Sequence, residues 1–247
     1  MCNRYTAPDV LDVERTWDVT GRNPLRWWDE VVPLRLGPYI KPGGILEVGQ
    51  WGMIPPGSQT RVPKKADGTR LNTNNARDDR VATARTYRGP WGHGQRCLIS
   101  AQSFIEPFWG YGNKNIWWRF ARADGLPWAL AGIWSEWTDP MTGEVVPSYS
   151  MLTQNCDAHP LLRLMHRPTI DPATKLPAAI QDKRAVVPIE REHWDRWLHG
   201  TQDQARGLIA LPALDQFAHG PEDPRTQVEL DLMTGQAVAV GPSDQLF

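Results

Sequence analysis

The stretch Trp128-Ala129-Leu130-Ala131-Gly132-Ile133-Trp134 contains no charged side chain and is bounded by Pro127 and Ser135. A short apolar run of this kind predicts a strand that is buried on both faces. The chain also has 22 Pro and 21 Gly, which repeatedly separate short apolar segments. This pattern is typical of a strand-rich domain with many turns. Further strands are predicted at Val31–Ile40, Val48–Ile54, Cys97–Ala101, Ile116–Phe120 and Tyr149–Thr153.

Helices are predicted to be short and to flank this β structure. Within Glu190–Leu198, the apolar residues Trp194, Trp197 and Leu198 follow the i, i+3, i+4 spacing of one helix face. A second helix is predicted at Pro8–Trp17. The pattern therefore predicts a strand-rich fold with short flanking helices, and a chain of 247 residues can form a single domain. We expect that domain to span residues 1–220, with residues 221–247 as a loosely attached tail.

The charge of the chain is unevenly distributed. The formal net charge is −1, but residues 61–96 carry nine basic and three acidic side chains, which gives +6 there and −7 elsewhere. A local basic segment can hold phosphate groups, although a solvated charged loop would have the same composition. Thirteen Trp against five Phe and five Tyr supply rings for core packing and for base stacking.

Cysteine content and hydropathy bear on the compartment. The three cysteines, Cys2, Cys97 and Cys156, are too few and too far apart for a disulfide framework or a CxxC-type metal site. The N-terminus has no apolar segment typical of a secretory signal, and no apolar run approaches the length of a membrane span. We expect a cytoplasmic monomer without a membrane partner.

Cys2 offers unusual chemistry because it becomes the N-terminus once Met1 is removed. An N-terminal cysteine carries an amine and a thiol on adjacent carbons, and both are partly reactive near neutral pH. The amine can condense with an aldehyde to a Schiff base, and the thiol can then close a thiazolidine ring. Position alone does not decide between this role and an incidental small residue.

Several ordered segments carry a family resemblance. They are Met1-Cys2-Asn3-Arg4, Trp51-Gly52-Met53-Ile54-Pro55, Asn74-Asn75-Ala76-Arg77, Arg96–Ala101 with Phe104-Ile105-Glu106, Ala131-Gly132-Ile133-Trp134, Met151-Leu152-Thr153, Met165-His166-Arg167-Pro168, Lys183–Pro188 and Trp194–Leu198. Over residues 2–200 the chain resembles the SRAP (SOS response-associated peptidase) family. The resemblance implies one α+β domain with a barrel-like, mostly antiparallel β core. It also implies a basic groove for single-stranded DNA with Cys2 at its floor, thiazolidine crosslinking to abasic sites, and no metal or cofactor.

The resemblance also assigns roles to residues. Asn75 would donate a hydrogen bond to the sugar or to the Cys2 amine. Glu106 would move protons during imine formation, and His166, titrating near pH 6.5, would help to open the sugar ring. Phosphate contacts fall on Arg4, Arg77 and Arg184. For Trp51 two roles stay open, which are base stacking and packing beneath the groove.

The chain departs from the family pattern at some points. Asn3 stands where many members have Gly, Pro107 stands where an aromatic residue is common, and the loop 169–182 after His166 is long. An aromatic pair that some members carry after the Trp-Gly segment is replaced by Pro56-Gly57-Ser58. These departures concern DNA stacking and groove shape more than the chemistry.

Two other functions use overlapping residues. An N-terminal-nucleophile hydrolase would attack an amide with the Cys2 thiolate, while Asn75 helps to form an oxyanion hole. Such chemistry could also remove Met1, with Cys2 and Glu106 as participants. A non-enzymatic single-strand binder would need the basic segment and the Trp residues but not Cys2. When bound to DNA, the protein is expected at the nucleoid.

Overall fold

The computed structural model describes residues 1–109, 115–226, 228–232 and 236–239 of the chain. The strands are β1 (Tyr5–Thr6), β2 (Gly21–Arg22), β3 (Glu30–Val31), β4 (Leu36–Lys41), β5 (Ile45–Trp51), β6 (Asn75–Arg77), β7 (Arg96–Ala101), β8 (Ser103–Phe108), β9 (Ile116–Arg122), β10 (Trp128–Thr138), β11 (Val145–Asn155), β12 (Arg184–Val186), β13 (Phe217–Pro221), β14 (Val228–Asp231) and β15 (Gln236–Ala239). The helices are α1 (Val10–Thr16), α2 (Arg88–Gly92), α3 (Trp194–His199) and α4 (Gln202–Arg206), with 3-10 turns η1 (Leu162–Leu164), η2 (Arg191–His193) and η3 (Leu214–Gln216).

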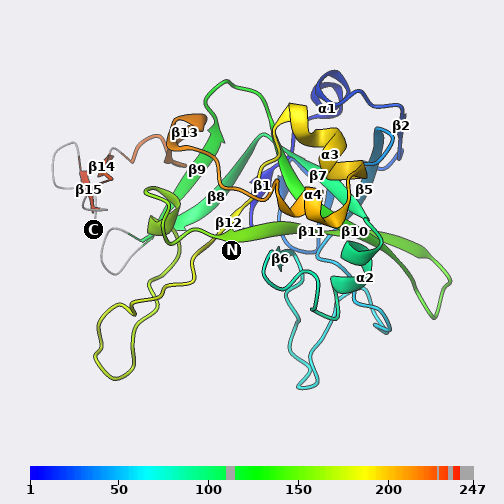
Figure 1. Cartoon of the computed structure of the whole chain (residues 1–247), viewed down its shortest axis with the longest axis horizontal. Helices are drawn as coiled ribbons and strands as arrows, with labels where there is room; N and C mark the ends of the chain where they lie inside the picture. The colour runs from blue at the N-terminus through cyan, green and yellow to red at the C-terminus, as the bar shows by residue number, and fades with distance from the viewer. Residues whose placement is uncertain (110–114, 227, 233–235, 240–247) are drawn as a thin grey trace.

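A closed β-barrel forms the centre of the molecule (Figure 1). The strands β11, β10, β7, β4 and β5 pair antiparallel in that order, and β5 returns to β11 through a parallel pairing of Tyr149 with Trp51. The predicted barrel-like, mostly antiparallel α+β fold is confirmed. Closure removes the free edges that an open sheet of these strands would leave.

Strand β10 contains the apolar run Trp128–Trp134. Residues Trp128 to Ile133 are all buried, because alternate side chains pack into two hydrophobic clusters on the opposite faces of the strand. Gly132 is required by packing, since a Cβ there would lie 2.7 Å from the Ile99 side chain and 2.8 Å from Cys97 Sγ. The predicted strand is therefore present, and it extends to Thr138.

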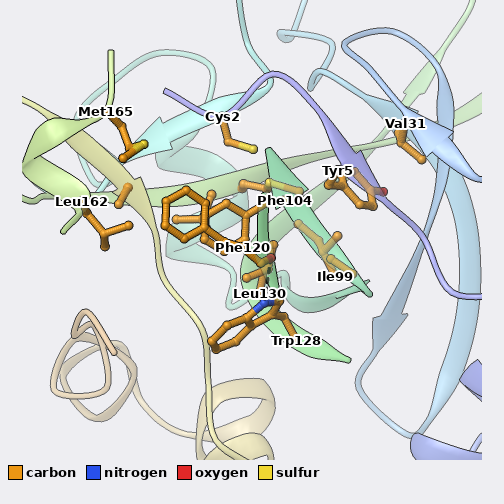
Figure 2. Packing of buried hydrophobic residues seen from close by; sticks show 14 of the residues in the cluster. Cys2, Tyr5, Val31, Ile99, Phe104, Phe120, Trp128, Leu130, Leu162 and Met165 are labelled. Carbon is orange, nitrogen blue, oxygen red and sulfur yellow. Dashed lines mark hydrogen bonds between the residues drawn. The ribbon is translucent and has the colours of Figure 1, made fainter. Parts of the chain in front are cut away.

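A second sheet, in the order β13-β9-β8-β1-β3, carries the N-terminal strand. The hydroxyls of Tyr5 on β1 and Tyr149 on β11 lie 2.6 Å apart and join this sheet to the barrel. Gly37 in β4 leaves room for that contact, because a Cβ there would lie 2.2 Å from both hydroxyls. The start of the chain is thus fixed in the interior, and Figure 2 shows Cys2 in one buried cluster with Tyr5 and Met165.

One predicted strand is wrong in its extent. Val31–Ile40 is divided between β3 and β4, which belong to different sheets. The break falls at Pro33 and at Leu34, whose φ of 77° lies in the left-handed region that a bulky side chain rarely adopts. A turn there carries the chain from the second sheet into the barrel.

The helices cover the barrel as short elements. The predicted helix at Glu190–Leu198 forms as η2 followed by α3, and the indole N–H of buried Trp197 donates to Cys97 O at 2.9 Å. Helix α1 begins after Asp9, whose carboxylate accepts from the Asp12 backbone N–H. In the described part of the chain, no helix is long and apolar enough to cross a membrane.

Two long loops project from the body, one at residues 57–72 and one at residues 167–183 (Figure 1). The second includes the long loop that the sequence indicates at residues 169–182. Beyond β13, the strands β14 and β15 pair with each other, and Val228, Leu230 and Leu232 pack against the core. That the residues from 221 onward form a loosely attached tail stays a prediction.

Candidate functional site at the N-terminus

The backbone of Cys2 is held by two consecutive asparagines. Asn74 Nδ2 and Asn75 Nδ2 donate to the Cys2 carbonyl oxygen at 3.0 and 2.7 Å. Asn75 begins β6, which is fixed by its parallel pairing with Met151 of β11. The family resemblance implies that Asn75 donates to the sugar or to the Cys2 amine. In the structure Asn75 donates to the carbonyl oxygen of Cys2 instead. Asn74 was not predicted, although its place beside Asn75 was the available signal.

Glu106 lies beside the Cys2 thiol and is almost fully buried. Its position on β8 turns it to the same side as Phe104 and Phe108, toward the interior. Burial raises the pKa of Glu106 to about 7, opposed by the positive charge of the Met1 amine and by the hydrogen bond with Cys2. Glu106 Oε1 has no hydrogen-bond partner within the described structure. A carboxyl group with this pKa can both give and take a proton at neutral pH.

The Cys2 side chain is a thiol in this arrangement rather than a thiolate. Burial raises its pKa well above the usual value, and the nearby negative charge of Glu106 adds to this effect. The Sγ atom donates weakly to Arg4 O at 3.5 Å. Activation of the thiol therefore requires a neighbouring base to take its proton.

His166 reaches the same point from the loop after η1. Its backbone N–H donates to Pro107 O at 2.6 Å, next to the Phe108–Met165 bridge, which ties the His166 segment to β8. The Nε2 atom of His166 lies 2.7 Å from the Met1 amine and 3.2 Å from Glu106 Oε2. The imidazole therefore contacts both the N-terminus and the buried carboxyl group.

The pKa of His166 differs from the sequence-based expectation of about 6.5. Burial, together with the positive charges of the Met1 amine and Lys183, lowers it to about 3. The imidazole is thus neutral near pH 7, and its 3.2 Å contact with Glu106 is not an ion pair. Opposite shifts in two adjacent groups assign different roles to them, because Glu106 can exchange a proton at neutral pH while His166 remains an acceptor.

The arginines expected to contact phosphate carry carboxylate partners. Arg4 lies between Glu30, at 3.4 Å, and Glu222, and its guanidinium lies 4.8 Å from the centre of the Trp117 ring. Arg77 pairs with Asp79 at 2.8 Å and with Asp182 at 2.7 Å. Each must exchange a carboxylate for a phosphate if it is to bind DNA.

Arg184 is poorly placed for the predicted phosphate contact. Its side chain is 7% exposed. It pairs with Asp78 at 3.0 Å, Asp79 at 3.2 Å and Asp182 at 2.7 Å. Three carboxylates around Arg77 and Arg184 leave this cluster without surplus positive charge. These ion pairs join β12 to the segment that follows β6, and the phosphate contact of Arg184 stays a prediction.

Base stacking by Trp51 is excluded by its burial. The ring is 0% exposed, packs edge-on against Tyr5 at 5.2 Å between centroids, and donates its indole N–H to Asn74 O at 2.9 Å. Of the two roles left open, packing beneath the site is the one that the structure permits. Trp51 thereby supports the asparagine that holds Cys2.

Exposed cations lie instead on the loop at residues 57–72. Lys64 and Arg70 form an isolated bridge, and together with Lys65 they are exposed and make no ion pair within the described ranges. Among the described residues, no three His, Cys, Asp or Glu side chains are arranged to hold a metal ion.

The chain is similar in sequence to several known proteins. The family model described as "SOS response associated peptidase (SRAP)" matches residues 1–221. The abasic site processing protein HMCES of Rattus norvegicus is 23% identical over 209 residues, which cover 71% of this chain and 51% of that protein. The Gallus gallus protein of the same name is 26% identical over 181 residues, covering 66% of this chain and 47% of that protein. The chain thus spans about half the length of these curated relatives.

Solved structures show the same fold. A crystal structure of a Bordetella bronchiseptica protein is 30% identical with a TM-score of 0.75, covering 89% of this chain and 99% of that one. A Bacteroides thetaiotaomicron protein has a TM-score of 0.67 at 18% identity, covering 91% of this chain and 94% of that one. The second likeness concerns the fold alone.

Proposed function

The chain belongs to the SOS response associated peptidase (SRAP) family, and from this premise we propose that it captures abasic sites in single-stranded DNA through Cys2 after removal of Met1. One observation carries the proposal. Asn75, Glu106 and His166 come from separate parts of the chain and converge on the Met1-Cys2 segment. The relatives named as abasic site processing proteins support the choice of substrate.

The proposed reaction forms two bonds to one carbon. The Cys2 amine adds to the aldehyde carbon of the ring-opened abasic sugar, and the resulting carbinolamine loses water to give an imine. The Cys2 thiol then adds to the imine carbon, and its proton passes to the nitrogen, which closes a thiazolidine ring. The overall reaction releases one water molecule and requires no oxidant, reductant or cofactor.

Glu106 and His166 would divide the proton transfers between them. The carboxyl group of Glu106, with a pKa of about 7, can protonate the departing carbinolamine oxygen and then accept the thiol proton. Neutral His166 can accept a hydrogen bond from the sugar hydroxyl as the closed ring opens, and because its pKa is lowered to about 3 it polarises this O–H rather than holding the proton. The buried Oδ1 of Asn75 has no partner in the described structure and can accept a hydrogen bond from the freed amine.

Met1 must leave before this chemistry begins, because its peptide bond occupies the Cys2 nitrogen. We infer a self-cleavage in which the Cys2 thiol attacks the Met1 carbonyl carbon. A thioester forms, the Met1–Cys2 peptide bond breaks, and Glu106 carries the thiol proton to the departing nitrogen. Water then hydrolyses the thioester and releases methionine. The 2.7 Å contact of the Met1 amine with His166 would hold the leaving residue in place.

DNA would be held chiefly through its phosphates. Arg4 and Arg77 are placed to exchange carboxylate for phosphate partners, while Lys64 and Lys65 are exposed and unpaired in the described structure. Such contacts carry no base sequence preference. We propose that the protein acts as a monomer in the cytoplasm and associates with the nucleoid when it is bound to DNA.

The hydrolase alternative receives less support. Both mechanisms need Glu106 to take the proton of the Cys2 thiol, whose pKa is raised by burial, so the thiol does not separate them. The hydrolase requires a free donor for an oxyanion, whereas Asn75 Nδ2 already donates to the Cys2 carbonyl oxygen. Self-cleavage at Met1 is a single turnover and does not need a pocket for other amides.

Crosslinking on a denaturing gel tests the proposal. Wild-type protein should form a denaturation-resistant adduct with a single-stranded oligonucleotide that contains one abasic site. Cys2→Ala should form none, while its non-covalent binding stays within a few fold. Cys156→Ala is the matched control, because this buried internal cysteine has no free α-amine, and it should retain the adduct. An adduct with Cys2→Ala would contradict the mechanism.

A further inference from the structure

Lys183 is a buried lysine whose ammonium group donates hydrogen bonds to one short turn of backbone. Its side chain is 6% exposed and donates to three successive carbonyl oxygens, which are Met165 O at 2.9 Å, His166 O, and Arg167 O at 3.0 Å. No carboxylate in the described structure forms an ion pair with it. A buried ammonium with three carbonyl acceptors is fully satisfied in hydrogen bonding, since it has three N–H donors.

Lys183 itself is fixed to the barrel. It precedes β12, and its backbone carbonyl accepts from Cys156 N at 2.9 Å at the end of β11. The Asp157 carboxylate accepts from the backbone N–H groups of Asp182 and Lys183 at 2.9 and 2.8 Å. The end of the long loop is therefore fixed to the barrel. The hydrogen bonds of the Lys183 ammonium then hold the start of the loop to its end.

The turn held in this way contains His166 in an unusual conformation. The φ angle of His166 is 62°, in the left-handed region that residues other than glycine seldom occupy. Such a conformation persists only when the surroundings impose it, and it is often found at functional sites. In this conformation His166 Nε2 lies 2.7 Å from the Met1 amine and 3.2 Å from Glu106 Oε2.

We propose that Lys183 is the positioning residue for His166, holding its backbone turn so that the imidazole faces the N-terminus and Glu106. The reaction readout of this role rests on the proposed function. Lys183 does not touch the reacting atoms, so its effect must pass through His166. The His166 ring contacts the N-terminal amine and Glu106 and hydrogen-bonds the Arg184 backbone, while the charge of the Lys183 ammonium helps to keep the imidazole neutral.

The test is a double-mutant cycle between Lys183→Met and His166→Ala. The crosslinking rate is measured at saturating abasic-site oligonucleotide, and affinity is measured separately by fluorescence anisotropy. Loss of an acid/base group in an exposed groove is expected to cost about 100-fold, at the low end of the usual range. Lys183→Met should therefore slow crosslinking by roughly tenfold or more with unchanged affinity, and adding it to His166→Ala should cost nothing further.

Control variants separate this role from simple loss of stability. Lys175→Met removes an exposed lysine from the same loop and should leave the rate unchanged. Lys183→Gln keeps two N–H donors and covers the case in which Lys183→Met does not fold, and it should also slow crosslinking. A wild-type rate in folded Lys183→Gln or Lys183→Met, or independent effects that multiply in the double mutant, would overturn the proposal.

A spectroscopic measurement distinguishes failure of this inference from failure of the proposed function. In DNA-free protein, the ring signal of His166 in the NMR spectrum should move toward that of exposed His199 in Lys183→Met but not in Lys175→Met. An unmoved His166 signal would contradict the positioning role whether or not the protein crosslinks DNA. Absence of wild-type crosslinking together with a moved signal would refute only the proposed function.

Discussion

Glu106→Gln should make the protein more stable, and the gain should depend on pH. Burial raises the pKa of Glu106 to about 7 in the folded protein, from 4.5 for an ordinary glutamate. The folded state therefore prefers the neutral carboxyl group. Between these two pKa values the unfolded chain binds fewer protons than the folded chain, so stability falls as the pH rises from about 4.5 through about 7. Glutamine is neutral at every pH and removes this dependence.

The size of the effect follows from the two pKa values. The raised pKa of Glu106 lowers the stability of the folded state by about 1 kcal/mol at pH 5 and by about 3 kcal/mol at pH 8. The stability difference between Glu106→Gln and wild type should therefore be larger at pH 8 than at pH 5 by about 2–3 kcal/mol. For a chain of this length that is a change of about 5–10 °C in Tm.

Urea denaturation at pH 5 and pH 8 measures this difference directly. The N-terminus of both proteins should first be confirmed by mass, because the amine next to Glu106 affects its pKa. Glu192→Gln removes one exposed carboxylate and controls for the change in net charge. If the gain in stability from Glu106→Gln were equal at the two pH values, the raised pKa, and with it the proton-transfer role, would be refuted.

His166→Ala should slow crosslinking roughly 10- to 100-fold without lowering the final yield, and the factor should be constant from pH 5 to 8, because the pKa of the imidazole is lowered to about 3. A gel time course at several pH values checks this, and a factor that changed sharply near pH 6.5 would contradict it. Arg184→Ala should lower stability by about 1–2 kcal/mol, less than for a fully buried pair because its carboxylate partners are partly exposed. DNA affinity in this variant should be almost unchanged, and a large loss of affinity would restore Arg184 as a phosphate contact. Arg4→Ala should reduce the slope of log affinity against log salt by about 0.7, the value for one phosphate contact on a single strand. Titrations of labelled single-stranded DNA at several salt concentrations would measure it, and an unchanged slope would exclude Arg4 as a contact.

The fold could be predicted where local pattern determines structure. The apolar run from Trp128 to Trp134 forms the strand that its composition predicts, because hydrophobic clusters cover both of its faces from Trp128 to Ile133. The stretch Val31–Ile40 contains Arg35 and two prolines, and the chain turns at Pro33 and Leu34 from one sheet into the other. Pro33 was the available signal for this break, whereas the hydrogen bond that Leu34 N donates to Trp51 O at 2.7 Å depends on a residue distant in the sequence.

The candidate site divides in a similar way. The residues that the family resemblance assigns to the site, Asn75, Glu106 and His166, are brought to the N-terminus by the fold. Their electrostatics could not be predicted, because the low pKa of His166 results from burial and from nearby charges. The positioning role of Lys183 could not be predicted from the sequence, because the ammonium group binds three backbone carbonyls that only the fold brings to it.

The number of basic residues in the sequence overestimates how many cations are free to bind DNA. Arg77 and Arg184 share carboxylates from Asp79 and Asp182, which are distant in the sequence. Pairing of this kind is a property of the folded chain. Residues 61–96 therefore contribute fewer free cations to DNA binding than the net charge of +6 indicates.

Intact mass spectrometry of the protein before and after incubation with an abasic-site oligonucleotide tests the central claim most directly. The account predicts that the protein alone lacks Met1. After incubation, a single adduct should appear whose mass is the sum of protein and oligonucleotide minus one water. Peptide mapping should place the DNA on Cys2. Absence of this adduct in protein that begins at Cys2, or an adduct located at any other residue, would contradict the account.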